Sequence, residues 1–284
     1  MRFPPIFLFF LPLFLIAKIH CVASIAPVES FAKAIGGREV TLSLMVPPGQ
    51  SPHTYEPKPS QMRAIANADC YLAVGVEFEK AWLPRFLSQN PKMIVVDLSR
   101  GIKKYPMVSP LEGLAGHQNE RGLDPHIWTA PENVKMMGRH IAETFEKLDP
   151  AHKELYAKRL QAFLGSVDAT DRKIRNILSA LPPHSAFMVF HPSWGYFARE
   201  YGLRQLPVEI EGKAPKPRQL MQLIDEAKRE HVRAIFVQPE FSQKSARLLA
   251  RELKIPIVSV SPLSSDWEKT LLKLARALSG KKLR

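Results

Sequence analysis

The sequence predicts an α/β protein in which parallel sheets are covered by helices and two halves are joined by one long helix. Strand-like apolar runs alternate with helical patterns along most of the chain, the order expected of parallel sheets with helical crossovers. One helical pattern of about 30 residues, at 151–181, divides the chain. The elements after it repeat the order of those before it.

The first half contains three expected strands and three expected helices. The run at 38–46 alternates apolar and polar residues and stops at Pro47-Pro48-Gly49. Proline opens two of the helices, at Pro59 and Pro131, because its missing N–H breaks no helical hydrogen bond there. We expect strands at 38–46, 69–75 and 92–97, helices at 59–68, 77–87 and 131–148, and an irregular stretch at 99–124.

The long central helix is indicated by apolar residues that keep helical spacing from Leu155 to Leu181. Asp149-Pro150 ends the helix before it, and Pro182-Pro183 ends this one. A helix of this length spans roughly 45 Å, about the size of a whole lobe. We therefore expect an N-terminal metal-binding lobe at 24–150, a linking helix at 151–181 and a C-terminal metal-binding lobe at 182–284.

The second half repeats the alternation with short apolar runs and amphipathic segments. Runs of this length are typical of buried strands in parallel sheets. Strands are expected at 186–190, 202–208, 233–237 and 256–260. Helices are expected at 193–201, 217–230, 242–253 and 266–278.

The N-terminus resembles a signal peptide. Arg2 is followed by an apolar stretch at 6–17 that is too short to span a bilayer, and Cys21-Val22-Ala23 ends in small residues. We expect cleavage after Ala23, so that residues 1–23 are a signal peptide and the mature protein is periplasmic. Lipid attachment at Cys21 is disfavoured, because Lys18, Ile19 and His20 are large or charged. Cleavage would leave Cys70 as a buried core cysteine with no disulfide partner.

The formal net charge of the chain is +13. Its lysines and arginines are spread along the expected helices, which is typical of solvated helix faces. A basic balance can indicate a nucleic-acid partner, but exported chains seldom meet nucleic acid. We therefore expect no nucleic-acid partner.

Three histidines far apart in the chain, His53, His126 and His191, each stand beside a proline where a strand-like or extended run stops. In parallel sheets such positions meet at the binding edge outside the carboxyl ends of the strands. Imidazole is the commonest metal ligand and favours zinc, copper, iron or nickel over calcium or magnesium. Two facing lobes would bring the rings to one metal site. Spacing alone is also compatible with a second interpretation, in which each histidine caps its own loop and binds no metal.

With their neighbours, these residues resemble the ZnuA/TroA group of metal-binding components of ABC importers. The most specific motif is Asp-Pro-His-Ile-Trp at 124–128. The resemblance extends over residues 24–280 and is carried by the segments 26–37, 52–60, 124–132, 190–197, 236–241 and 260–263. It implies two Rossmann-like lobes with parallel sheets, one rigid connecting helix, and one ion held between the lobes. It implies His53 and His126 as N-lobe ligands and His191 as the C-lobe ligand.

The chain departs from the resemblance at the fourth ligand. Many members use an aspartate where this chain has Ser261, and a neutral hydroxyl is a poor metal ligand. The fourth position stays open at this point, with water, Asp266, Glu209, Glu211 and Glu240 as candidates. The histidine-rich loop of many zinc-specific members is reduced here to a short loop with His117.

The resemblance implies a periplasmic solute-binding protein, not an enzyme, that delivers its ion to an ABC permease in the inner membrane. Three imidazoles favour Zn²⁺ over Mn²⁺, and we expect Zn²⁺, rather than Mn²⁺ or Fe²⁺, as the ion carried. We expect a monomer whose lobes shift little, because a helix connects them. The alternatives are a manganese or iron(II) carrier of the same family, an exported zinc hydrolase, and a surface adhesin.

Overall fold

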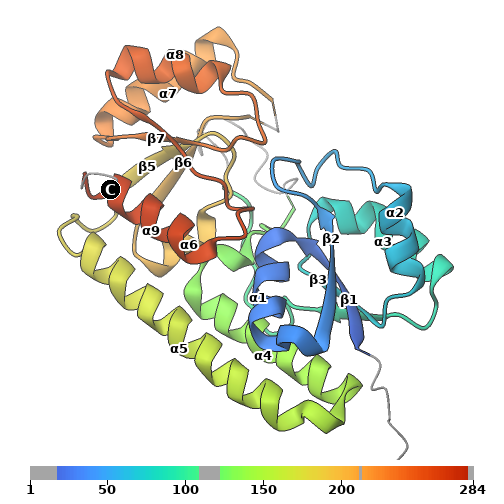
Figure 1. Ribbon diagram of the computed structural model, residues 1–284. Coiled ribbons are helices and arrows are strands. Elements are labelled where there is room, and N and C mark those ends of the chain that lie inside the picture. Colours follow the sequence, from blue (N-terminus) through green and yellow to red (C-terminus); the bar gives the residue numbers. More distant parts are fainter. Residues whose placement is uncertain (1–17, 109–121, 211–212, 281–284) are drawn as a thin grey trace, which may run out of the picture.

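The computed structural model describes residues 18–108, 122–210 and 213–280. The apolar stretch at 6–17, His117 and Glu211 lie outside the described residues. Within the described ranges, the chain forms two lobes, each built on a four-stranded parallel sheet, above one long helix (Figure 1). The predicted α/β class with two parallel sheets is confirmed.

The two sheets have the same strand order. The N-lobe order is β2-β1-β3-β4, and the C-lobe order is β6-β5-β7-β8. In each lobe the order reverses beside the first strand, between β1 and β3 and between β5 and β7. Such switch points open a crevice at the carboxyl ends of the strands. The strands are β1 Ile19–Ile25, β2 Val40–Val46, β3 Cys70–Ala73, β4 Ile94–Asp97, β5 Ala186–Val189, β6 Arg204–Pro207, β7 Ile235–Val237 and β8 Ile257–Ser259.

Helices cover the sheets, and most lie within a few residues of their predicted bounds. Pro59, Pro131 and Pro217 each stand in the first turn of a helix, as expected of proline at that position. The helices around the sheets are α1 Ala26–Gly36, α2 Pro59–Ala66, α3 Glu77–Gln89, α4 Pro131–Leu148, α6 Gly195–Glu200, α7 Pro217–Arg229, α8 Lys244–Leu253 and α9 Trp267–Leu278.

The predicted linking helix is α5, Lys153–Leu178, which has 26 residues. Figure 1 shows it running beneath both lobes. It packs against α1 and α4 of the N-lobe and against α9 of the C-lobe. Tyr156, Phe163, Val167 and Ile174 form its buried side at helical spacing.

The first strand corrects the expected cleavage after Ala23. Strand β1 lies in the middle of the N-lobe sheet and pairs with both β2 and β3. Removal of residues 1–23 would take away most of this strand, including Cys21, Val22 and Ala23, which have no exposed surface. A central strand packed on both sides favours small and apolar residues. Small residues are also the mark of a signal-peptide cleavage site, so the segment at 21–23 fits both interpretations. The fold therefore includes residues 19–23.

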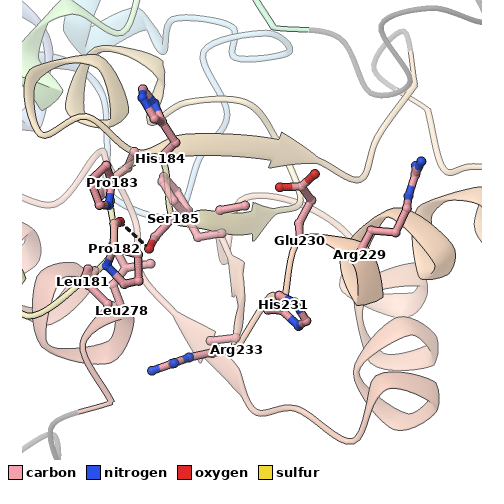
Figure 2. Close-up of a pocket in the computed structure, with 14 residues that line it drawn as sticks. Leu181, Pro182, Pro183, His184, Ser185, Arg229, Glu230, His231, Arg233 and Leu278 are labelled. Carbon is pink, nitrogen blue, oxygen red and sulfur yellow. Dashed lines mark hydrogen bonds between the residues drawn. The ribbon is translucent and has the colours of Figure 1, made fainter.

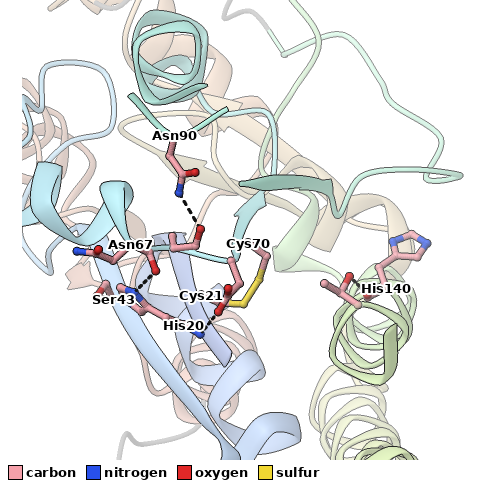
Figure 3. The surroundings of a disulfide bond; sticks show 10 residues. His20, Cys21, Ser43, Asn67, Cys70, Asn90 and His140 are labelled. Carbon is pink, nitrogen blue, oxygen red and sulfur yellow. Dashed lines mark hydrogen bonds between the residues drawn. A yellow bond between two sulfur atoms is a disulfide. The ribbon is translucent and has the colours of Figure 1, made fainter. Parts of the chain in front are cut away.

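The expectation that Cys70 has no disulfide partner is wrong. Cys21 of β1 and Cys70 of β3 stand opposite each other in register and form a disulfide (Figure 3). Their Cα atoms are 4.7 Å apart, within the usual range for such a bond. The bond closes a long stretch of chain, since the two cysteines are 49 positions apart.

The lobes share a continuous apolar core at their junction. Trp267 of α9 donates from Nε1 to the backbone oxygen of Trp128 at 2.7 Å, and Trp128 donates from Nε1 to the backbone oxygen of Pro262 at 2.8 Å. The Trp267 ring also packs edge-on against Phe31 of α1, with ring centres 5.8 Å apart. These buried indoles fix the lobes relative to each other, because each satisfies its N–H across the junction.

A carboxylate of the C-lobe lies at the start of α4. Both carboxylate oxygens of Glu200 accept from the backbone N–H of Glu132, at 3.3 and 3.4 Å. Burial raises the pKa of Glu200 from 4.5 to about 7, with the Glu132 N–H acting in the opposite direction. Asp171 and Glu132 also raise the pKa of Glu200, and Arg175 lowers it.

This raised pKa predicts a pH-dependent stability. Between pH 4.5 and about 7 the folded protein retains a proton on Glu200 that the unfolded chain has lost, so the contribution of Glu200 to stability falls as pH rises. Glu200→Gln should remove this loss, with a slope difference of up to about 1.4 kcal/mol per pH unit. Urea denaturation at several pH values checks it, and parallel curves for the two proteins would contradict it.

Candidate metal centre

The three predicted histidines converge on one cavity between the lobes. His53 lies in the loop after β2, His126 directly precedes the short 3₁₀ helix Ile127–Thr129, and His191 follows β5. The ring centres of His53 and His191 are 5.0 Å apart, and those of His126 and His191 are 5.2 Å apart. All three rings line a cavity of about 20 Å³, and a site measured this way needs roughly 10–15 Å³ to hold one water.

The separations of the His53–His191 and His126–His191 ring pairs match those of imidazoles around one tetrahedral ion. A Zn–N bond of about 2.0–2.1 Å places each ring centre roughly 3 Å from the ion, so two rings at a tetrahedral angle lie about 5 Å apart. Within the described residues, no group of three or more His, Cys, Asp or Glu side chains is already arranged to hold a metal ion. The rings are therefore gathered at one place, without their ligand atoms set in a finished coordination shell.

His126 is oriented by the aspartate two residues before it. Asp124 Oδ1 accepts from the ring Nδ1 of His126 at 2.7 Å and from its backbone N–H at 2.9 Å. A carboxylate on Nδ1 makes that nitrogen the donor and leaves Nε2 with a lone pair, the arrangement of many metal-binding histidines. Gly195 permits this packing, since a Cβ at that position would lie 2.7 Å from Asp124 Oδ2.

His191 is held in the same way and is the most deeply buried of the three rings. Its Nδ1 is 2.9 Å from Glu209 Oε1, and its ring stacks on Phe241 with centres 4.6 Å apart. Gln238 fixes the backbone, accepting from the His191 N–H at 3.2 Å and donating to its carbonyl at 2.8 Å.

The remaining ring nitrogen of His191 has the properties of a metal ligand. Nε2 is buried and has no hydrogen-bond partner within the described residues. Burial lowers the pKa of His191, and the hydrogen bond that its ring donates to Glu209 acts in the opposite direction. A neutral imidazole with an unused lone pair is the form that binds a metal, and an unpaired buried polar atom in a native fold usually has a partner such as an ion or water.

His53 lies at the solvent side of the cavity, with 30% of its side chain exposed. Its Nδ1 contacts the carboxylate of Glu77, which stands in the first turn of α3. The hydrogen bond from His53 is the main cause of the lowered pKa of Glu77. All three imidazoles thus have a carboxylate at Nδ1, from Glu77, Asp124 and Glu209.

The structure shows which of the candidates for a fourth ligand line the cavity. Asp266 caps α9, with its carboxylate accepting from the Lys269 N–H at 3.3 Å, and it does not line the cavity. Glu209 supports His191 at Nδ1 and does not line the cavity either. Glu240 does line it, and burial raises its pKa. Ser261 donates a hydrogen bond to Glu240 Oε1.

A larger cavity of about 340 Å³ lies at the opposite end of the C-lobe sheet, before the strands begin. Its basic side chains include His184, Arg229 and Arg233, which point in different directions (Figure 2). Glu230 at its edge forms an ion pair with Arg204. No set of polar groups converges there among the residues that Figure 2 labels, so the histidine cavity is the candidate site.

Comparison with known proteins finds one matching family for the chain. The model of the family described as "ZnuA: Zinc-uptake complex component A periplasmic" matches residues 21–279. A zinc-bound crystal structure of a ZnuA deletion mutant is 36% identical, with a TM-score of 0.84, and the match covers 94% of this chain and 100% of that one.

Two curated relatives carry other metals in their names. The manganese ABC transporter substrate-binding lipoprotein PsaA of Streptococcus anginosus is 28% identical over 253 residues, which is 84% of this chain and 78% of the relative. The iron ABC transporter substrate-binding lipoprotein MtsA of Streptococcus pyogenes serotype M1 is 29% identical over 254 residues, 85% of this chain and 79% of the relative.

Proposed function

Since this chain belongs to the ZnuA family, we propose that it captures Zn²⁺ between its lobes and delivers it to an ABC permease. Members of the family are metal-binding substrate-binding proteins of ABC importers and are not enzymes.

One observation supports the proposal most strongly: the convergence of His53, His126 and His191, each with a carboxylate at Nδ1. Carboxylates in this position fix the tautomer and raise the basicity of the opposite nitrogen. The rings come from both lobes, so an ion bound by all three would join the lobes. We infer that His53, His126 and His191 are the metal ligands.

The donor set favours zinc over the manganese that one of the two relatives carries in its name. Imidazole suits zinc, whereas manganese prefers carboxylate, carbonyl and water oxygens. The most deeply buried donor, His191 Nε2, is a nitrogen on the C-lobe side of the cavity. The zinc-bound structure at 36% identity is consistent with this choice.

The architecture supports delivery by small movements. Helix α5 packs against both lobes. The indole N–H groups of Trp128 and Trp267 each donate to a backbone oxygen of the opposite lobe. We propose a monomer of the periplasm that docks on an inner-membrane permease with little rearrangement of its lobes.

No helix in the described part of the chain is long and apolar enough to cross a membrane. The sulfur of Cys21 is bonded to Cys70, which argues against lipid attachment at Cys21.

Competition calorimetry tests the proposed metal. Zinc and manganese are titrated separately into metal-free protein at pH 7, and then manganese-loaded protein is titrated with zinc. We expect one zinc ion per chain and displacement of manganese by zinc, because three nitrogen donors dominate the site. Tighter binding of manganese than of zinc would overturn the assignment of zinc, and an absence of stoichiometric binding of either would overturn the metal-carrier function.

A further inference from the structure

A carboxylate faces the histidine cavity from the loop that follows β7. Glu240 lines the cavity together with the three histidines. Its Oε1 accepts a hydrogen bond from Ser261, which follows β8. Its Oε2 is buried and has no hydrogen-bond partner within the described residues. The two oxygens of one carboxylate are therefore in different situations, one held by a hydroxyl and one unsatisfied.

An unsatisfied buried carboxylate oxygen is unfavourable unless a partner joins it. Burying a polar group without a hydrogen bond destabilises the fold, and burying an unpaired charged group destabilises it more. Within the described residues, the other unsatisfied atom that belongs to this cavity is His191 Nε2. A single cation would satisfy both a nitrogen lone pair and a carboxylate oxygen.

The topology brings these two residues to the same cavity. His191 follows β5 and Glu240 follows β7, and these strands are neighbours at the switch point of the C-lobe sheet. Phe241, next to Glu240, stacks on the His191 ring at 4.6 Å. Glu77, Asp124 and Glu209 each hold the Nδ1 of one histidine. Glu209 also has a buried Oε2 without a hydrogen-bond partner within the described residues, but Glu240 lines the cavity and Glu209 does not.

We infer that Glu240 supplies the fourth metal ligand through Oε2, and that Ser261 is a positioning residue that holds Oε1. This inference rests on the proposed function and makes the site a set of three nitrogens and one oxygen. Ser261 thereby acts on the metal through Glu240. One carboxylate lowers the net positive charge of the ion together with its ligands, and a lower net charge is less costly to bury between the lobes.

Glu240→Gln tests the ligand role. It keeps the size of the side chain and replaces a charged oxygen with a neutral amide, so zinc affinity, measured by competition with a chelator, should fall about 100-fold; the loss of even an outer-shell partner typically costs 10–100-fold. Glu252→Gln, on the exposed side of α8, is the matched control and should leave zinc affinity unchanged.

Cobalt(II) absorption provides a readout that a purely structural role would not change. In protein saturated with Co²⁺, the visible bands report the donor set, so Glu240→Gln should shift them and Glu252→Gln should not. Ser261→Ala should weaken zinc binding about tenfold, because the Glu240 carboxylate loses the hydroxyl that orients it. Ser261→Thr keeps a hydroxyl and should bind zinc with wild-type affinity. Thermal unfolding of the metal-free variants checks that each is folded.

The outcomes separate this inference from the proposed function. If the wild type binds one zinc ion and Glu240→Gln binds it with the same affinity and the same cobalt spectrum, Glu240 is not a ligand, and the three-histidine site stands. If the wild type binds no zinc, the proposed function fails first. A weakened site with a shifted cobalt spectrum supports both.

Discussion

Replacing His191 with alanine is expected to weaken zinc binding by at least about 100-fold while the protein remains folded. Loss of an outer-shell partner alone typically costs 10–100-fold, and His191 provides the donor itself. His126→Ala should have an effect of the same size, because its ring lies 5.2 Å from that of His191 in the same cavity. Isothermal titration of zinc into each variant measures the loss.

The same loss should appear in thermal stability. A ligand at 100 times its Kd stabilises the folded state by about 2.7 kcal/mol, so at that zinc concentration each variant should lose most of the zinc-dependent increase in Tm. His140→Ala is the matched control: this histidine lies on α4 and approaches the Leu98 carbonyl, away from the cavity. Zinc binding of wild-type strength in both His126→Ala and His191→Ala would exclude the three-histidine site.

Removing the disulfide is expected to destabilise the protein by about 4 kcal/mol. The bond closes a loop in which the cysteines are 49 positions apart, and the loop-entropy relation gives about this value for such a length. The double variant Cys21→Ala, Cys70→Ala tests it without leaving a free thiol. Urea denaturation of wild type and variant gives the difference in unfolding free energy.

Reduction of the wild-type protein is the control for the double variant. Both should lose a similar free energy of unfolding, while zinc affinity of the folded protein stays within about threefold, because the disulfide lies near the start of β1 and β3 and the cavity lies beyond the strand ends. A loss below about 1 kcal/mol would show that the sheet holds these strands without the bond. The pairing also fits the proposed periplasmic location, since disulfides persist in oxidising compartments.

The alternation of elements was sufficient to predict the fold class and most element positions. Helix α4 has the predicted bounds, and α5 starts and ends within three residues of the predicted 151–181. These segments are long and periodic, so local pattern determines them. Strand β1 was missed because its small apolar residues are compatible both with a cleavage site and with a central strand. That error also removed Cys21 from consideration and left Cys70 without a partner.

The convergence of the histidines followed from a general property of parallel sheets, namely that the carboxyl ends of their strands meet at one edge. The carboxylates at Nδ1 were harder to predict. Asp124 could have been found, since it stands two residues before His126 in an Asp-Pro-His motif. Glu77 and Glu209 lie far in sequence from the histidines that they hold, and only the strand order brings them together.

The contact between Ser261 and Glu240 could not be predicted from local sequence. It joins the loops after β7 and β8, whose relative position depends on the pairing of those strands. The sequence alone therefore left Asp266 as a candidate ligand, although this residue caps α9. A short carboxylate near a helix start is equally compatible with both roles until the fold is known.

X-ray absorption at the zinc edge, on protein loaded with one equivalent of zinc, tests the convergence of the three imidazoles most directly. Imidazole rings bound through nitrogen give characteristic multiple scattering whose strength reports how many are bound. We predict a four-coordinate nitrogen and oxygen shell with three imidazoles. A shell of oxygen atoms with one imidazole or none would contradict a site shared by His53, His126 and His191.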